Sequence, residues 1–169
     1  MKDIDSGKLH LPKIDSDNDD ERISAILIPD EPFDFDEGEY IELPEASLET
    51  LTRYHKFLAD KLPAKLKMTG REDLGYFAWE ERFSFDGGSS KEYKALKKQY
   101  ASCDDKFEFV GLDLLSEEFG LIAKVKRMSD QKIFMIPLVD LVTFKEKRKE
   151  RQLVDDYSSW FVNFGPENI

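Results

Sequence analysis

The chain has 169 residues, of which 40% are hydrophobic and 12% aromatic, and this content is typical of a folded protein with one main core. Its one cysteine, Cys103, excludes both an internal disulfide and a cysteine-based metal site. The first residues lack the apolar run of a signal peptide, and no stretch is apolar for the length of a membrane span. From these exclusions we expect a soluble cytoplasmic protein with no membrane partner.

The net charge of −11 is unevenly distributed along the chain. Residues 1–50 contain 16 acidic and 4 basic residues, whereas residues 51–169 contain 20 acidic and 21 basic ones. The later part is therefore close to neutral. Its one basic cluster, residues 145–151, has acidic residues interleaved, which is typical of a solvated connector. Nucleic-acid binding needs a concentrated positive face, so we expect no nucleic-acid partner.

Residues 1–46 are predicted to form an acidic, partly flexible N-terminal extension ahead of a single domain at 47–169. The run at 15–21 invites comparison with an EF-hand calcium loop, which needs Gly at its sixth position and Glu at its twelfth. Counted from Asp15, these positions hold Asp20 and Ile26, so the run is not an EF-hand.

Two segments of this extension carry apolar side chains. Residues 23–28 are a short apolar run closed by Pro29, which predicts an edge strand or a docking segment. Residues 29–44 alternate acidic and aromatic side chains. We expect them to lie across a neighbouring surface as an extended strap, or to bind a protein partner.

The clearest helix is predicted at residues 47–62. Ser47 is a suitable N-cap, but Thr50 stands where a capping box has Glu, so we expect an incomplete box. Pro63 ends the helix. Its apolar stripe is expected to face the core, and the members of this stripe are Leu48, Leu51, Tyr54, His55, Leu58 and Leu62.

The later part of the chain is predicted to be rich in short strands. Alternation of apolar and polar residues indicates strands at 63–68, 76–85, 106–112, 121–127, 132–136 and 137–142. A second short helix is expected at 91–100, and an acidic loop at 113–118. The aromatic run within 152–164 predicts a last, buried strand with Asp155 and Asp156 at its start. These elements predict an α+β fold: a small, strongly bent antiparallel sheet or half-open barrel, with a packed N-terminal helix and a second short helix.

Several of these segments together resemble a known family, the small bacterial calcium-binding proteins of the CcbP type. The resemblance is carried by residues 51–58, 62–63, 110–112, 120–121 and 136–141, and above all by the closing motif at 152–163. It covers residues 51–164, and is best over 106–164. Relative to the compact family form, residues 69–101 look like an insertion and residues 1–46 look additional.

The resemblance implies calcium as the ligand, bound by clustered loop carboxylates outside any EF-hand. Ca²⁺ takes six to eight oxygen ligands, and separate loops can provide them. The candidate metal ligands in the matching region are Asp113, Glu117, Glu118, Asp140, Asp155 and Asp156, with Asp104 and Asp105 as second-rank candidates. For Asp155 and Asp156 the alternative is that they bond backbone amides or stay solvated.

Two functions therefore remain open from the sequence. The first is a calcium buffer or sensor. The second is a non-catalytic protein-interaction module that keeps the fold without the metal. Catalysis is not expected, because Cys103 has no histidine nearby in sequence and there is no Gly-rich phosphate loop.

Overall fold

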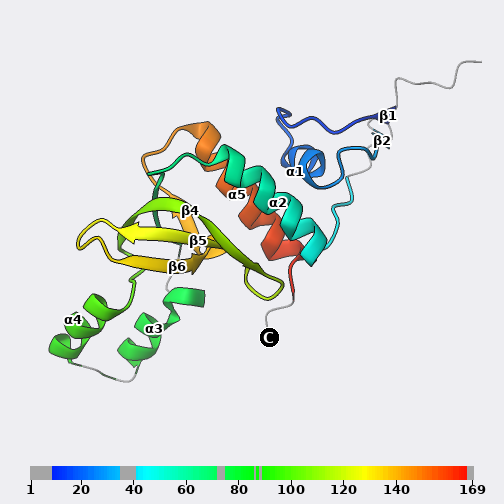
Figure 1. The fold of residues 1–169 in the computed structure, drawn as a ribbon. Coiled ribbons are helices and arrows are strands. Elements are labelled where there is room, and N and C mark those ends of the chain that lie inside the picture. The colour runs from blue at the N-terminus through cyan, green and yellow to red at the C-terminus, as the bar shows by residue number, and fades with distance from the viewer. Residues whose placement is uncertain (1–8, 35–40, 72–74, 86, 88, 167–169) are drawn as a thin grey trace, which may run out of the picture.

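The computed structural model describes residues 9–34, 41–71, 75–85, 87 and 89–166 (Figure 1). Its α-helices are α1 Asp19–Leu27, α2 Leu48–Lys61, α3 Ala78–Phe85, α4 Ser90–Gln99 and α5 Arg148–Phe164, with 3₁₀ turns η1 Gly75–Phe77 and η2 Leu138–Asp140. The main strands are β3 Lys67–Gly70, β4 Lys106–Ser116, β5 Gly120–Arg127, β6 Ile133–Pro137 and β7 Leu141–Thr143. A separate two-stranded pair is formed by β1 Leu9–His10 and β2 Phe33–Asp34.

The five main strands form one open antiparallel sheet in the order β6-β5-β4-β3-β7. The pairing of β4 with β5 shifts register twice, between Phe109 and Gly111 and between Leu112 and Leu115. Such irregularities bend a strand and increase its twist. The predicted α+β class with a bent antiparallel sheet is therefore confirmed, and the sheet does not close into a barrel.

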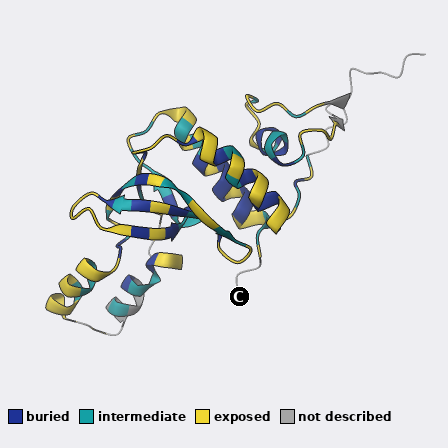
Figure 2. Cartoon of the chain, viewed as in Figure 1, coloured by how far each residue is buried: buried dark blue, intermediate teal, exposed yellow. Residues whose placement is uncertain are grey.

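The core lies between this sheet and the pair α2 and α5, which run side by side across one of its faces (Figures 1 and 2). Tyr54 of α2 packs edge-on against Tyr157 of α5, with ring centroids 5.2 Å apart, and also against Trp160 at 5.3 Å. The inward side chains of β4 and β5, among them Phe107 and Val125, are fully buried beneath them. Burial of large side chains of this kind contributes about 1.5–3 kcal/mol for each one.

The N-terminus of α2 agrees with the prediction except in its cap. Ser47 Oγ accepts from Thr50 N at 3.2 Å, and Ser47 N donates to Thr50 Oγ1 at 2.8 Å. The capping box is thus complete, and the prediction of an incomplete one was wrong, because a threonine hydroxyl can accept this bond as a glutamate does. Leu48, predicted to be on the buried stripe, is 57% exposed.

The largest correction concerns residues 152–164, which form most of helix α5 and not a strand. Their buried members Val154, Tyr157, Trp160 and Phe161 follow the spacing of one helical face, while Val162 on the opposite face is 70% exposed. Density of apolar residues favoured a strand in the sequence, but their period is helical. Asp155 and Asp156 consequently lie within a helix and not at the entrance to a strand.

Four other predicted strands differ from the structure. Residues 137–142 are divided between the end of β6, the 3₁₀ turn η2 and the beginning of the short strand β7. Residues 23–27 are the end of α1, which Asn18 caps by accepting from Glu21 N at 3.1 Å. Residues 76–85 are helical in η1 and α3, and β3 begins at Lys67 and not at residue 63. The predicted second short helix is confirmed as α4, which has Ser89 as its N-cap and begins one residue earlier than predicted.

Helix α4 is attached to the sheet by polar contacts, since none of its residues is buried. The guanidinium of Arg127, a residue only 2% exposed on β5, donates to the carbonyl oxygens of Lys97, Lys98 and Tyr100. These carbonyls belong to the last turn of α4 and its C-cap, which have no partner inside the helix. Arg127 also pairs with the carboxylates of Asp105 at 2.9 Å and Asp130 at 2.8 Å.

The two buried tyrosines in the α2–α5 contact give a matched test of this core. Tyr157 Oη accepts from the backbone N–H of Leu121 at 2.8 Å, whereas the hydroxyl of Tyr54 is buried without a partner among the described residues. We expect Tyr157→Phe to lower the free energy of unfolding by about 1–3 kcal/mol, because a buried N–H loses its acceptor. Tyr54→Phe should be neutral or stabilising. Urea unfolding measures both, and equal losses for the two variants would contradict this account.

The pair Arg127–Asp130 predicts a pH dependence. The hydrogen bond from Arg127 lowers the pKa of Asp130 to about 2 from its ordinary 3.8. A lowered folded-state pKa stabilises the fold above about pH 4, and this contribution is lost as the pH falls toward 2. The difference in unfolding free energy between wild type and Asp130→Asn should therefore shrink over that window. Ser129→Ala, in the same turn but without loss of a carboxyl, should keep the wild-type pH dependence.

Candidate functional site

The carboxylate of Asp156 is engaged in an ion pair that joins the last helix to the first. Its oxygens accept from Arg22 Nε at 2.8 Å and from Arg22 Nη2 at 2.9 Å, so the pair is bidentate. Arg22 also donates from Nη1 to the carbonyl of Ser16 at 2.7 Å. Both side chains are nearly buried, at 9% and 11% exposure. A carboxylate held in this way has its lone pairs directed at a cation that the chain itself supplies.

Further acidic side chains surround this ion pair. Burial raises the pKa of Asp156, Arg22 opposes the rise, and repulsion from Asp19 and Asp155 adds to it. The acidic first turn of α1 and the acidic pair of the closing motif are therefore brought together at the α1–α5 contact. The sequence analysis treated these two stretches separately. One signal was present: Arg22 is the one basic residue between Asp15 and Asp30.

Asp113, Glu117 and Glu118 lie near the far end of the β4–β5 hairpin. Asp113 is exposed within β4, and its carbonyl contacts His55 Nε2 at 3.1 Å. Glu117 and Glu118 are exposed in the turn, which Ser116 Oγ organises by accepting from the amides of Glu118 and Phe119. The loop predicted at 113–118 is shorter, because residues 113–116 belong to the strand.

Asp140 lies in η2, half-buried, and accepts from the backbone N–H of Tyr76 at 3.2 Å. Burial raises its pKa, while the bond from Tyr76 and the charge of Arg71 lower it. The adjoining Gly75 has φ of +58°, and a Cβ there would overlap the Asp140 carboxyl. Asp140 thus occupies a closely packed position with little room for a hydrated ion on that side.

The two second-rank candidate metal ligands, Asp104 and Asp105, differ in exposure and in hydrogen bonding. Asp104 is exposed in the turn before β4. The carboxylate of Asp105 is already hydrogen-bonded within the protein, since its Oδ2 accepts from Ser102 N at 2.8 Å and from Arg127 Nη1 at 2.9 Å.

The six first-rank carboxylates are therefore distributed over the β4–β5 hairpin, η2 and α5. Over the described part of the chain, no three His, Cys, Asp or Glu side chains are grouped so that they could hold a metal ion. In the same ranges no helix is long and apolar enough to cross a membrane.

Residues 41–46 lie against the end of α5. Trp160 Nε1 donates to the carbonyl of Pro44 at 2.9 Å, Ala46 N donates to the carbonyl of Phe164 at 2.8 Å, and Leu43 is buried. Residues 41–44 are the C-terminal part of the predicted strap at 29–44. Residues 35–40 of that segment lie outside the described residues.

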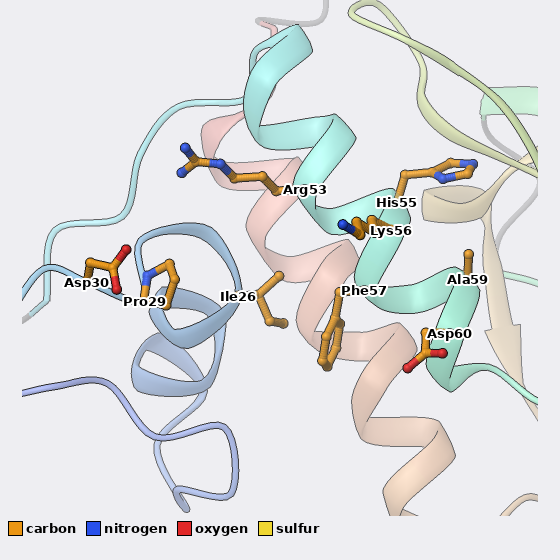
Figure 3. Close-up of a pocket in the computed structure, with 9 residues that line it drawn as sticks. All are labelled: Ile26, Pro29, Asp30, Arg53, His55, Lys56, Phe57, Ala59 and Asp60. Carbon is orange, nitrogen blue, oxygen red and sulfur yellow. The ribbon is translucent and has the colours of Figure 1, made fainter.

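A groove of about 1030 Å³ lies between α1 and α2 (Figure 3). Its floor is formed by Ile26 and Phe57, and its charged rim includes Arg53, Lys56 and Asp60. His55 points away from α1 in this view, consistent with its contact to Asp113. None of the predicted ligand carboxylates lines this groove.

The fold is shared with a protein of known structure. A solved structure of a calcium binding protein, in its calcium-binding form, superposes with a TM-score of 0.51 over 90% of this chain and 96% of that one. The sequences are 11% identical over this match, so the likeness concerns the fold. No protein-family model and no curated protein sequence matches the chain.

The ion pair between α1 and α5 can be tested by comparing single and double variants. Arg22→Met leaves the Asp156 carboxylate buried without its partner, and should lower the free energy of unfolding by about 3–5 kcal/mol. The double variant Arg22→Met with Asp156→Leu removes both charges and should recover most of that loss. Urea unfolding followed by tryptophan fluorescence measures each. A double variant as unstable as the single one would show that the unpaired charge is not the cause.

Proposed function

We propose that this chain is a non-catalytic calcium-binding protein of the non-EF-hand type, acting in the cytoplasm as a buffer or sensor. The observation that carries the proposal is the fold, which is shared nearly end to end with a calcium binding protein in its calcium-binding form. It is also the function that the resemblance of residues 152–163 to the CcbP type implies.

The proposed ligands begin with Asp155, which is exposed on α5, and Asp19 at the start of α1. Both repel the Asp156 carboxylate, and a cation beside them would relieve this repulsion. Asp156 itself is held by Arg22, so its oxygens would serve the cation only if that bond opened. The hairpin acids Asp113, Glu117 and Glu118 form a second candidate location.

Weak affinity follows from this arrangement. Ca²⁺ needs six to eight oxygens, and two exposed carboxylates supply at most four, so waters must complete the shell. Affinity for Ca²⁺ falls as the charged ligands become fewer and as the site becomes more flexible, and the weakest protein sites have dissociation constants of about 10⁻⁴–10⁻³ M. We propose a site in that range, with Asp140 outside it because of its close packing.

A second candidate function is favoured by a specific observation. Asp156 already has a buried cation partner, and the described residues contain no ready-made group of three metal ligands. Both are expected of a protein-interaction module that keeps this fold without calcium. Its partner would bind the acidic and aromatic segment at 29–44.

A thermal melt of metal-free protein with about 10 mM CaCl₂ distinguishes these functions. If the dissociation constant is about 10⁻⁴ M, this concentration is a hundredfold excess and should stabilise the fold by about 2.7 kcal/mol. The shift should exceed that with MgCl₂ at equal concentration, and it should fall in Asp155→Asn and in Asp19→Asn.

Asp60→Asn, which removes an exposed helical carboxylate elsewhere on the surface, is the matched control and should keep the shift. If Ca²⁺ and Mg²⁺ give equal, salt-like shifts in every variant, the calcium proposal fails and the interaction module becomes the leading function. If Glu117→Gln with Glu118→Gln abolishes the shift and Asp155→Asn does not, the site lies on the hairpin.

A further inference from the structure

A second, smaller groove lies between α5 and the edge strand β7, and it differs from the one in Figure 3 in the polar groups that line it. Its volume is about 610 Å³, within the range of pockets that bind small molecules. The lining residues are Arg71, Val142, Thr143, Arg151, Asp155, Ser158, Ser159, Val162 and Asn163.

Two hydroxyls in this lining are buried and have no hydrogen-bond partner among the residues that the structure describes. They are Ser158 Oγ, on a residue 3% exposed, and Thr143 Oγ1. A buried hydroxyl without a partner is unfavourable because it has lost its hydrogen bonds to water, so such groups are rare in folded proteins. None of the residues that line the groove in Figure 3 carries such an atom within the described ranges. The two hydroxyls belong to residues of different elements, α5 and β7, which both line the groove.

Two guanidinium groups line the same groove. Arg71 donates from Nε to the carbonyl of Val139 at 3.1 Å. No group among the described residues accepts a hydrogen bond from its two Nη atoms. The side chain of Arg151 has no hydrogen bond or ion pair within the same ranges. Guanidinium groups bind carboxylate and phosphate through paired N–H donors, and serine and threonine hydroxyls donate to the same oxygens.

We propose that this groove binds a small oxyanion, a carboxylate or a phosphate group, between Arg71 and Arg151 with Ser158 and Thr143 as additional donors. The proposal goes beyond calcium binding and does not depend on it. Asp155 is the one acidic residue in the lining and repels an anion, so the groove carries a single net positive charge. Asp155 therefore lowers the affinity of the groove for an anion, whereas it favours calcium at the site proposed above.

The test is a titration of metal-free protein with inorganic phosphate. Thermal melting is the readout at each phosphate concentration, and NaCl keeps the ionic strength constant. Sodium sulfate and sodium acetate are titrated in parallel, and they separate a preference for phosphate from one for carboxylate. Metal is removed beforehand on a chelating resin, because a soluble chelator such as EDTA carries carboxylates and would compete for the groove. Saturable stabilisation is expected with at least one of the three anions.

Four variants locate the binding. Arg151→Gln should weaken it about tenfold, as expected for loss of a charged hydrogen-bond donor, whereas Arg148→Gln on the same helix but outside the groove should leave it unchanged. Ser158→Ala should leave the anion-free melting temperature equal or higher, because an unpartnered hydroxyl is removed, and should reduce the anion-induced shift. Asp155→Asn should strengthen anion binding while it weakens calcium binding.

Each outcome decides the proposal separately from the calcium site. Stabilisation that is not saturable, or that Arg148→Gln and Arg151→Gln reduce equally, overturns it. An unchanged anion shift in Ser158→Ala also overturns the assignment to this groove, even if Arg151→Gln loses stability for other reasons. Loss of the calcium shift in Asp155→Asn with a retained or stronger phosphate shift would support both sites.

Discussion

The packing of α5 against α2 and the sheet is the constraint on which the rest of this structure depends. Tyr157, Trp160 and Phe161 fill the space between the helix pair and the strands, and Tyr54 of α2 meets two of them. Once this face is buried, the helical period decides where every other residue of α5 points. Asp156 is turned inward beside α1, whereas Asp155 is turned toward solvent and the β7 groove.

The buried carboxylate of Asp156 explains why α1, in the N-terminal part of the chain, packs against α5. An ionised group in this position is unfavourable unless it is paired, and Arg22 provides the pairing from a helix 134 residues earlier. Ile23 and Leu27, on the same helix, are buried in the common core. The α1 segment is thus held by one ion pair and two apolar side chains, and Trp160 and Phe164 add backbone contacts to residues 44 and 46.

The two ligands proposed for this protein both involve the exposed side of α5. Asp155 belongs to the acidic group that includes Asp19 and also to the lining of a groove with two arginines. The negative charge of Asp155 therefore favours binding of the proposed cation and opposes binding of the proposed anion. Helix α4 lies elsewhere and is attached through Arg127, so its contacts with the sheet are electrostatic and do not contribute to either proposed site.

The sequence by itself determined the elements whose signals are local. The Ser47 N-cap of α2, most of its apolar stripe, the short helix α4 and the alternating strands β4, β5 and β6 were predicted, because each follows from spacing and turn residues within a few positions. The separation into an acidic first part and a neutral remainder was also visible. Together these were enough for the α+β class.

Only the tertiary structure decided what α1 and α5 are and which polar groups meet. Seven of the 13 residues at 152–164 are apolar, and this density suits a buried strand as well as a buried helix; the surface of α2 that receives the helical face decides for the helix. Arg22 and Asp156, or Arg71 and Ser158, are brought together by chain folding over long separations, and no local pattern encodes such a pair. Candidate ligands could therefore be chosen from the sequence by residue type, but their partners could not, because pairing is a property of the packed helices.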